Sequence, residues 1–104
     1  MPELTINRDT DTGLLVAKLV PENRLLSDFL ESEVQQDKAF ISFLLDQVSD
    51  PDGLPFQING NAHGLSLTSG RYVITSLQDE TTTAGPLREL VGFLMQWQEF
   101  LSQT

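Results

Sequence analysis

The fold class is decided by residues 21–53, which read PENRLLSDFLESEVQQDKAFISFLLDQVSDPDG. Apolar residues recur in this segment at steps of three and four, the spacing of an amphipathic helix. Pro21 suits the start of a helix, and the Pro and Gly of Asp50-Pro51-Asp52-Gly53 end it. No apolar residue occurs from Gln35 to Lys38, so we expect the helix to bend or break there. The apolar positions are Leu26, Phe29, Leu30, Val34, Ile41, Leu44, Leu45 and Val48.

The sequence on both sides of this segment has the period of two that is typical of strands. Before it, Leu4 and Ile6 alternate with polar residues, and a polar turn ending at Gly13 leads into the aliphatic residues 14–20. This pattern predicts a β-hairpin. After it, three runs of strand-forming residues are separated by Asn59-Gly60 and Ser69-Gly70, which are strong turn signals. We therefore expect a three-stranded meander that ends near residue 77.

A polar and acidic loop is predicted over residues 78–85, followed by a last helix that begins at Pro86. The predicted order is ββαβββα in one domain, residues 1–104. Strands in two antiparallel groups, with helices between and after them, indicate an α+β fold. We expect an antiparallel sheet from the two strand groups, packed against two amphipathic helices.

The charge of the chain is strongly acidic, with 15 acidic and 6 basic residues and a net charge of −9. Most of the surplus lies in residues 28–52, where Lys38 is the only base. An acidic surface repels nucleic acid phosphates and anionic lipid headgroups, so we expect neither a nucleic acid nor a membrane as partner. The acids of this segment are Asp28, Glu31, Glu33, Asp37, Asp46, Asp50 and Asp52.

The chain has no cysteine, which excludes disulfides, thiolate metal sites and cysteine nucleophiles. The first residues do not have the pattern of a signal peptide, and the apolar runs are far shorter than the ~20 residues that span a bilayer. We expect a cytoplasmic protein.

Two motifs could carry a metal ion or a catalytic group. Asp9-x-Asp11-x-Gly13 resembles the start of a calcium loop, but the acid needed about twelve positions on is missing, and Val20 stands near there. A hairpin turn with local hydrogen bonds is the simpler interpretation. His63 is the only histidine, so it cannot build a standard zinc site, and a surface or structural role is favoured over a Ser–His–acid arrangement.

The carboxylate pairs Glu31/Glu33 and Asp79/Glu80 are candidates for catalytic acids. Their spacings of two and one do not place them on the same face of a helix, and a solvated acidic surface is the simpler interpretation. Gly60 is not followed by a helix whose N-terminus could hold a phosphate. The sequence therefore predicts no catalytic residue, no metal site and no cofactor.

The last helix carries the best candidate for an interface. Phe93, Trp97 and Phe100 form a stripe beside a second stripe of aliphatic residues, so more than half of the helix circumference is apolar. Such a wide apolar surface predicts a second burial partner, either another protein or a second copy of the chain. The alternative is that the first helix covers the excess.

The order of these signals resembles a small bacterial family typified by Escherichia coli YacL. The resemblance rests on Arg8-Asp9 followed by an aliphatic strand, on an acidic amphipathic helix, and on a His-containing strand at residues 62–67. It continues with a Gly turn into Arg71-Tyr72-Val73-Ile74 and a late aromatic at Trp97-Gln98-Glu99-Phe100. The family has no established activity, so the resemblance supports the architecture and implies no site.

These observations predict a non-enzymatic binding or regulatory domain that acts through a protein–protein interface as a homodimer. One alternative is an acidic inhibitor, immunity protein or secretion chaperone that covers a basic partner, since opposite charges accelerate encounter. Another is a small hydrolase that uses His63 with a carboxylate.

Overall fold

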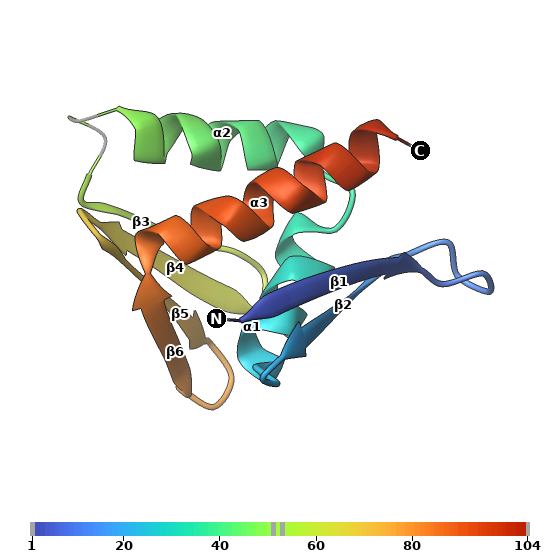
Figure 1. Ribbon diagram of the computed structural model, residues 1–104. Coiled ribbons are helices and arrows are strands. Elements are labelled where there is room, and N and C mark those ends of the chain that lie inside the picture. The colour runs from blue at the N-terminus through green and yellow to red at the C-terminus, as the bar shows by residue number, and fades with distance from the viewer. Residues whose placement is uncertain (1, 51, 53, 104) are drawn as a thin grey trace.

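The computed structural model describes residues 2–50, 52 and 54–103 and shows an α+β fold (Figure 1). A two-stranded sheet and a four-stranded sheet, both antiparallel, pack with helical segments around one core. The predicted α+β fold class is confirmed, and the elements follow the predicted order ββαβββα with one further strand before the last helix. The two predicted strand groups form separate sheets and not one sheet.

The first sheet is the predicted hairpin of β1 (Glu3–Arg8) and β2 (Leu15–Val20). Its inner face is apolar and its outer face is exposed, as the alternating sequence requires. The turn between the strands is closed by the Asp9 carboxylate, whose Oδ1 accepts from the Asp11 amide at 2.7 Å, while Gly13 has a φ of +75°. The Asp9-x-Asp11-x-Gly13 motif is therefore the expected hairpin turn.

The predicted long helix is divided into three segments: α1 (Arg24–Phe29), the π-helical turn η1 (Leu30–Val34) and α2 (Lys38–Ser49). Asn23 caps α1, accepting from the Leu26 amide. Asp37 caps α2, accepting from the Phe40 amide at 2.9 Å. The break falls at residues 35–38, where the apolar pattern weakens.

Gln35, at the break, ties the helical segment to the hairpin. Its side-chain amide accepts from the Leu15 amide at 2.6 Å and donates to the Leu15 carbonyl at 3.1 Å, so it pairs with the free edge of β2 much as another strand would. The Glu31 carboxylate bonds the same edge, accepting from the Ala17 amide at 2.8 Å. On the other edge of the hairpin, the Gln96 side chain donates to the Leu4 carbonyl at 2.7 Å. Both edges are thus covered by side chains from helices.

The second sheet contains β3 (Phe56–Asn59), β4 (His63–Thr68) and β5 (Arg71–Ser76), which form the predicted meander. The prediction of a loop over residues 78–85 is partly wrong, because β6 (Thr82–Pro86) adds a fourth strand beside β5. The run Thr82-Thr83-Ala84-Gly85 has too few apolar residues for the period-two signal to reveal it. Backbone pairing with the preceding strand stabilises it instead.

The last helix, α3 (Leu87–Ser102), lies antiparallel to α2 across the top of the molecule in Figure 1. Its buried residues include Trp97, which is 0% exposed and donates from Nε1 to the Gln35 carbonyl. Phe93 is also buried and Phe100 is half-buried. This burial corrects the predicted interface: Phe93 and Trp97 face the core and are not available to a partner, because the rest of the chain covers that side of α3.

Candidate functional site

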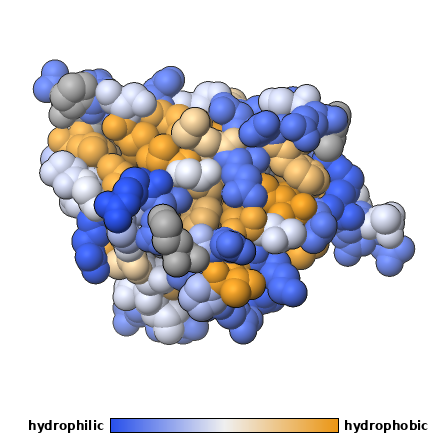
Figure 2. All heavy atoms as spheres, in the orientation of Figure 1, coloured by the Kyte–Doolittle hydropathy of each residue, from blue (hydrophilic) through white to orange (hydrophobic). Residues whose placement is uncertain are grey.

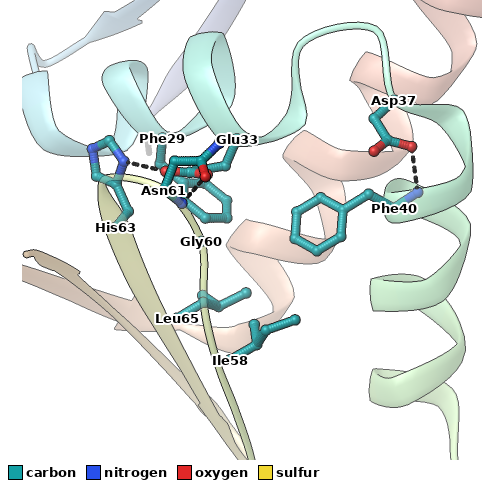
Figure 3. Close-up of a pocket in the computed structure, with 9 residues that line it drawn as sticks. All are labelled: Phe29, Glu33, Asp37, Phe40, Ile58, Gly60, Asn61, His63 and Leu65. Carbon is teal, nitrogen blue, oxygen red and sulfur yellow. Dashed lines mark hydrogen bonds and ion pairs between the residues drawn. The ribbon is translucent and has the colours of Figure 1, made fainter.

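The most unusual polar contact in the fold joins Glu33, on η1, to the start of β4. Oε2 of Glu33 accepts from the Ala62 amide at 2.9 Å and from Nδ1 of His63 at 3.0 Å. Oε1 accepts from the Asn61 amide at 3.1 Å. Figure 3 shows the carboxylate directed at the β3–β4 turn, with His63 beside it. We call this arrangement the Glu33 clamp.

The clamp is buried, since the side chains of His63 and Glu33 are 8% and 7% exposed. Burial alone would raise the pKa of the Glu33 carboxyl. The hydrogen bonds from His63 and from the Ala62 and Asn61 amides outweigh burial and hold this pKa below its ordinary value. The carboxylate is therefore ionised at neutral pH.

The neighbours of Nδ1 determine the tautomer of neutral His63. Ser32 Oγ lies 3.4 Å from Nδ1 and donates its own hydrogen to the Asp28 carbonyl at 2.6 Å. Both groups that face Nδ1, the Glu33 carboxylate and the Ser32 oxygen, are therefore acceptors. Nδ1 must carry the proton, which leaves Nε2 with a free lone pair.

Gly60 is required by the clamp. A Cβ atom at this position would collide with Oε1 of Glu33 and would lie 2.8 Å from its Cδ. The turn is also held by the Gly60 amide, which donates to the His63 carbonyl at 2.7 Å. The absence of a side chain lets the carboxylate lie directly against the backbone.

His63 lines two hollows. One, of about 170 Å³, lies beside Glu33 between η1, α2 and the second sheet, where apolar Phe29, Phe40 and Leu65 and acidic Glu33 and Asp37 line it (Figure 3). The other, of about 360 Å³, lies between α1 and the β5–β6 turn, where charged Arg24, Asp28 and Asp79 line it together with apolar Leu25 and Ala62. In Figure 3 the second ring nitrogen of His63 points away from Glu33.

The sequence prediction placed His63 on the surface or in a structural role, and the structure shows a buried histidine that anchors a turn. The interpretation of Glu31 and Glu33 as a solvated surface is wrong, because both carboxylates accept hydrogen bonds from backbone amides. They are directed at different sheets. Asp79 instead accepts from the Thr81 amide and hydroxyl, and hydrogen bonds from the Thr81 hydroxyl and amide and from Ser76 lower its pKa.

Chemically, the Glu33–His63 pair can accept a proton or a hydrogen bond at Nε2. The Ser32 hydroxyl lies at Nδ1 and donates to the Asp28 carbonyl, so it is not placed as a nucleophile for this base. Among residues 2–50, 52 and 54–103, no three His, Asp or Glu side chains come together as a group that could hold a metal ion.

None of the helices in the part of the chain that the structure describes is long and apolar enough to cross a membrane. No family model, no curated protein and no solved structure matches the chain. The resemblance to the YacL family stays a prediction.

Replacement of Glu33 by glutamine tests the clamp through the pH dependence of stability. The pKa of Glu33 is lowered in the folded state, so the unfolded chain binds this proton first as the pH falls. The stabilisation is present above the ordinary value of 4.5 and is lost as the pH falls through the lowered pKa. We expect Glu33→Gln to cost about 2 kcal/mol at pH 7, with a smaller difference from wild type below about pH 4. Urea unfolding at several pH values measures this, and a difference that is independent of pH would contradict it.

Replacement of Gly60 by alanine tests the close approach of carboxylate and turn. The added Cβ must displace Glu33, so we expect a loss of about 1–3 kcal/mol in the free energy of unfolding. Gly92, in the middle of α3, is the matched control, since a Cβ there meets nothing within 4 Å. Gly92→Ala should stabilise the protein by about 0.5–1 kcal/mol. Equal effects of the two substitutions would contradict the clamp.

Proposed function

We propose that the protein is a non-catalytic binding domain that associates with a second copy of itself through the outer side of α2 and α3. The observation that carries this proposal is an apolar area over α2 and the first half of α3, which Figure 2 shows as the broadest such area on that face of the molecule. We call it the α2–α3 face. The apolar residues of α2 and α3 that are at least partly exposed include Leu45, Val48, Leu87, Val91 and Met95.

The side chains of the α2–α3 face are not fully buried by the chain itself. Leu45, Val48, Leu87 and Val91 are half-buried, and Met95 is 56% exposed. Leu87, Val91 and Met95 follow one another at steps of four along α3, so they form one stripe on the helix. Exposed apolar residues that form a continuous area are typical of an interaction surface.

The charge distribution favours a second copy as the partner on this face. Helices α2 and α3 together carry two bases, Lys38 and Arg88, and three acids, so their net charge is −1, whereas the rest of the chain carries −8. Lys38 and Glu99 line the same shallow hollow between the helices. Two copies can therefore meet here without bringing their acidic surfaces together.

The alternative of a hydrolase that uses His63 receives less support from the geometry. The Glu33 carboxylate orients the ring of His63 through Nδ1, so a nucleophile activated by this ring would have to lie at Nε2. The Ser32 hydroxyl lies at Nδ1 instead. The three hydrogen bonds to Glu33 serve the β3–β4 turn. A structural role for the clamp and a binding role for the helices account for both features.

Light scattering on wild type and on Met95→Glu tests this proposal. We expect the wild type to have twice the mass of one chain, and Met95→Glu to raise the dissociation constant at least tenfold, because a carboxylate would be buried in an apolar interface. Val16→Glu is the matched control, since Val16 is exposed on the outer face of β2, away from the helices. It should leave the mass unchanged.

Two results would overturn the proposal. One is a wild-type monomer at the highest concentration at which the protein stays in solution. The other is dissociation by Val16→Glu with retention of the dimer in Met95→Glu, which would move the interface to the hairpin. Thermal melting of each variant shows whether it is folded.

A further inference from the structure

We propose that the hollow between α1 and the β5–β6 turn is a binding site for a guanidinium group, with Nε2 of His63 as one of its acceptors. This site shares His63 with the hollow beside Glu33 but has different lining residues otherwise, and it does not use the α2–α3 face. We call it the His63 hollow. The proposal is independent of self-association.

The first observation is the unused nitrogen of a buried side chain. The His63 side chain is 8% exposed, and its hydrogen bonds within the described residues are all made by Nδ1. No fully buried side-chain nitrogen or oxygen in that part of the chain lacks a hydrogen-bond partner. Nε2 must therefore reach the surface of the molecule, and it points away from Glu33 (Figure 3). His63 lines the His63 hollow, whereas Glu33 does not.

The second observation is that Nε2 is an acceptor. Because the Glu33 carboxylate and the Ser32 oxygen require the proton on Nδ1, neutral His63 offers a lone pair to the hollow. A ligand that fits this group must donate a hydrogen bond. A carboxylate or a fully ionised phosphate has no donor to offer.

The third observation is the charge of the wall. Asp28 on α1 and Asp79 in the β5–β6 turn line the hollow together with His63. Hydrogen bonds from the Thr81 hydroxyl and amide keep Asp79 ionised at neutral pH by lowering its pKa. Arg24 also lines the hollow and lies 3.6 Å from Asp28, but its side chain is 70% exposed and can turn away from the carboxylate.

These acceptors come from three different elements, α1, β4 and the β5–β6 turn, so they approach a ligand from different directions. A guanidinium group is planar and carries five N–H donors around its edge, whereas an ammonium is a compact point charge with three. The guanidinium therefore matches the spread of acceptors better. Its source is either a free guanidinium compound or an arginine side chain of a protein.

Titration of the 15N-labelled protein tests the proposal, with the His63 ring signals as the readout. The probes are methylguanidinium, N-acetyl-arginine methylamide and the matched citrulline compound, which has the same shape without the charge, all at one ionic strength. We expect saturable shifts of the His63 signals with both guanidinium probes, and at least tenfold weaker binding of the citrulline compound. Tighter binding of the arginine compound than of methylguanidinium would assign the site to an arginine residue, and equal binding to a free compound.

Asp28→Asn is the informative variant, because Asp28 is at the surface and its side chain is 46% exposed. We expect it to weaken guanidinium binding at least tenfold, while Asp46→Asn, the same change on α2, should have no effect. Absence of saturable shifts, equal binding of the citrulline compound, or equal effects of Asp28→Asn and Asp46→Asn would overturn the proposal.

Discussion

The carboxylate of Glu33 is the contact on which the arrangement of the two halves of the molecule depends. It extends from the π-helical turn η1 and accepts three hydrogen bonds from consecutive residues of the second sheet, Asn61, Ala62 and His63. Two residues further on, Gln35 bonds the hairpin through its side chain and Trp97 through its carbonyl. One short stretch of irregular helix therefore contacts the first sheet, the second sheet and α3. The break in the long helix allows Glu33 and Gln35 to make these contacts at the same time, because it directs neighbouring side chains toward different parts of the fold.

Part of the acidic composition is explained by hydrogen bonds from backbone amides to carboxylates. Within the described residues, six acids accept hydrogen bonds from backbone amides at turns, at a helix cap or at a strand edge. They are Asp9, Glu31, Glu33, Asp37, Asp50 and Asp79. A lysine or arginine side chain has no acceptor and cannot replace a carboxylate in this role. Part of the negative charge thus satisfies amides that secondary structure leaves without a partner. The two surfaces that we propose for binding differ in their charge. The α2–α3 face is nearly neutral, whereas the His63 hollow combines an unused acceptor with two carboxylates.

The sequence predicts the elements of this fold well and their contacts poorly. Hydrophobic period and turn residues correctly place the hairpin, the break at residues 35–38 and the meander, because these features depend on local sequence. The strand β6 was missed because its stability comes from pairing and not from its own composition. The sequence leaves open whether Trp97 faces a partner or the core, because a single helix does not reveal which elements will cover it. The pairing of Glu33 with His63 spans 30 residues, and the one local signal for it is that Glu33 falls four residues after buried Phe29, on the inner side of the helix.

Determination of the tautomer of neutral His63 tests the clamp most directly. A long-range 15N–1H correlation spectrum of the neutral ring distinguishes a proton on Nδ1 from a proton on Nε2. Two acceptors face Nδ1, so the account predicts that neutral His63 is protonated there, and that Glu33→Gln weakens this preference. A ring protonated at Nε2, or a mixture of tautomers like that of a free histidine, would contradict both the clamp and the acceptor role of Nε2.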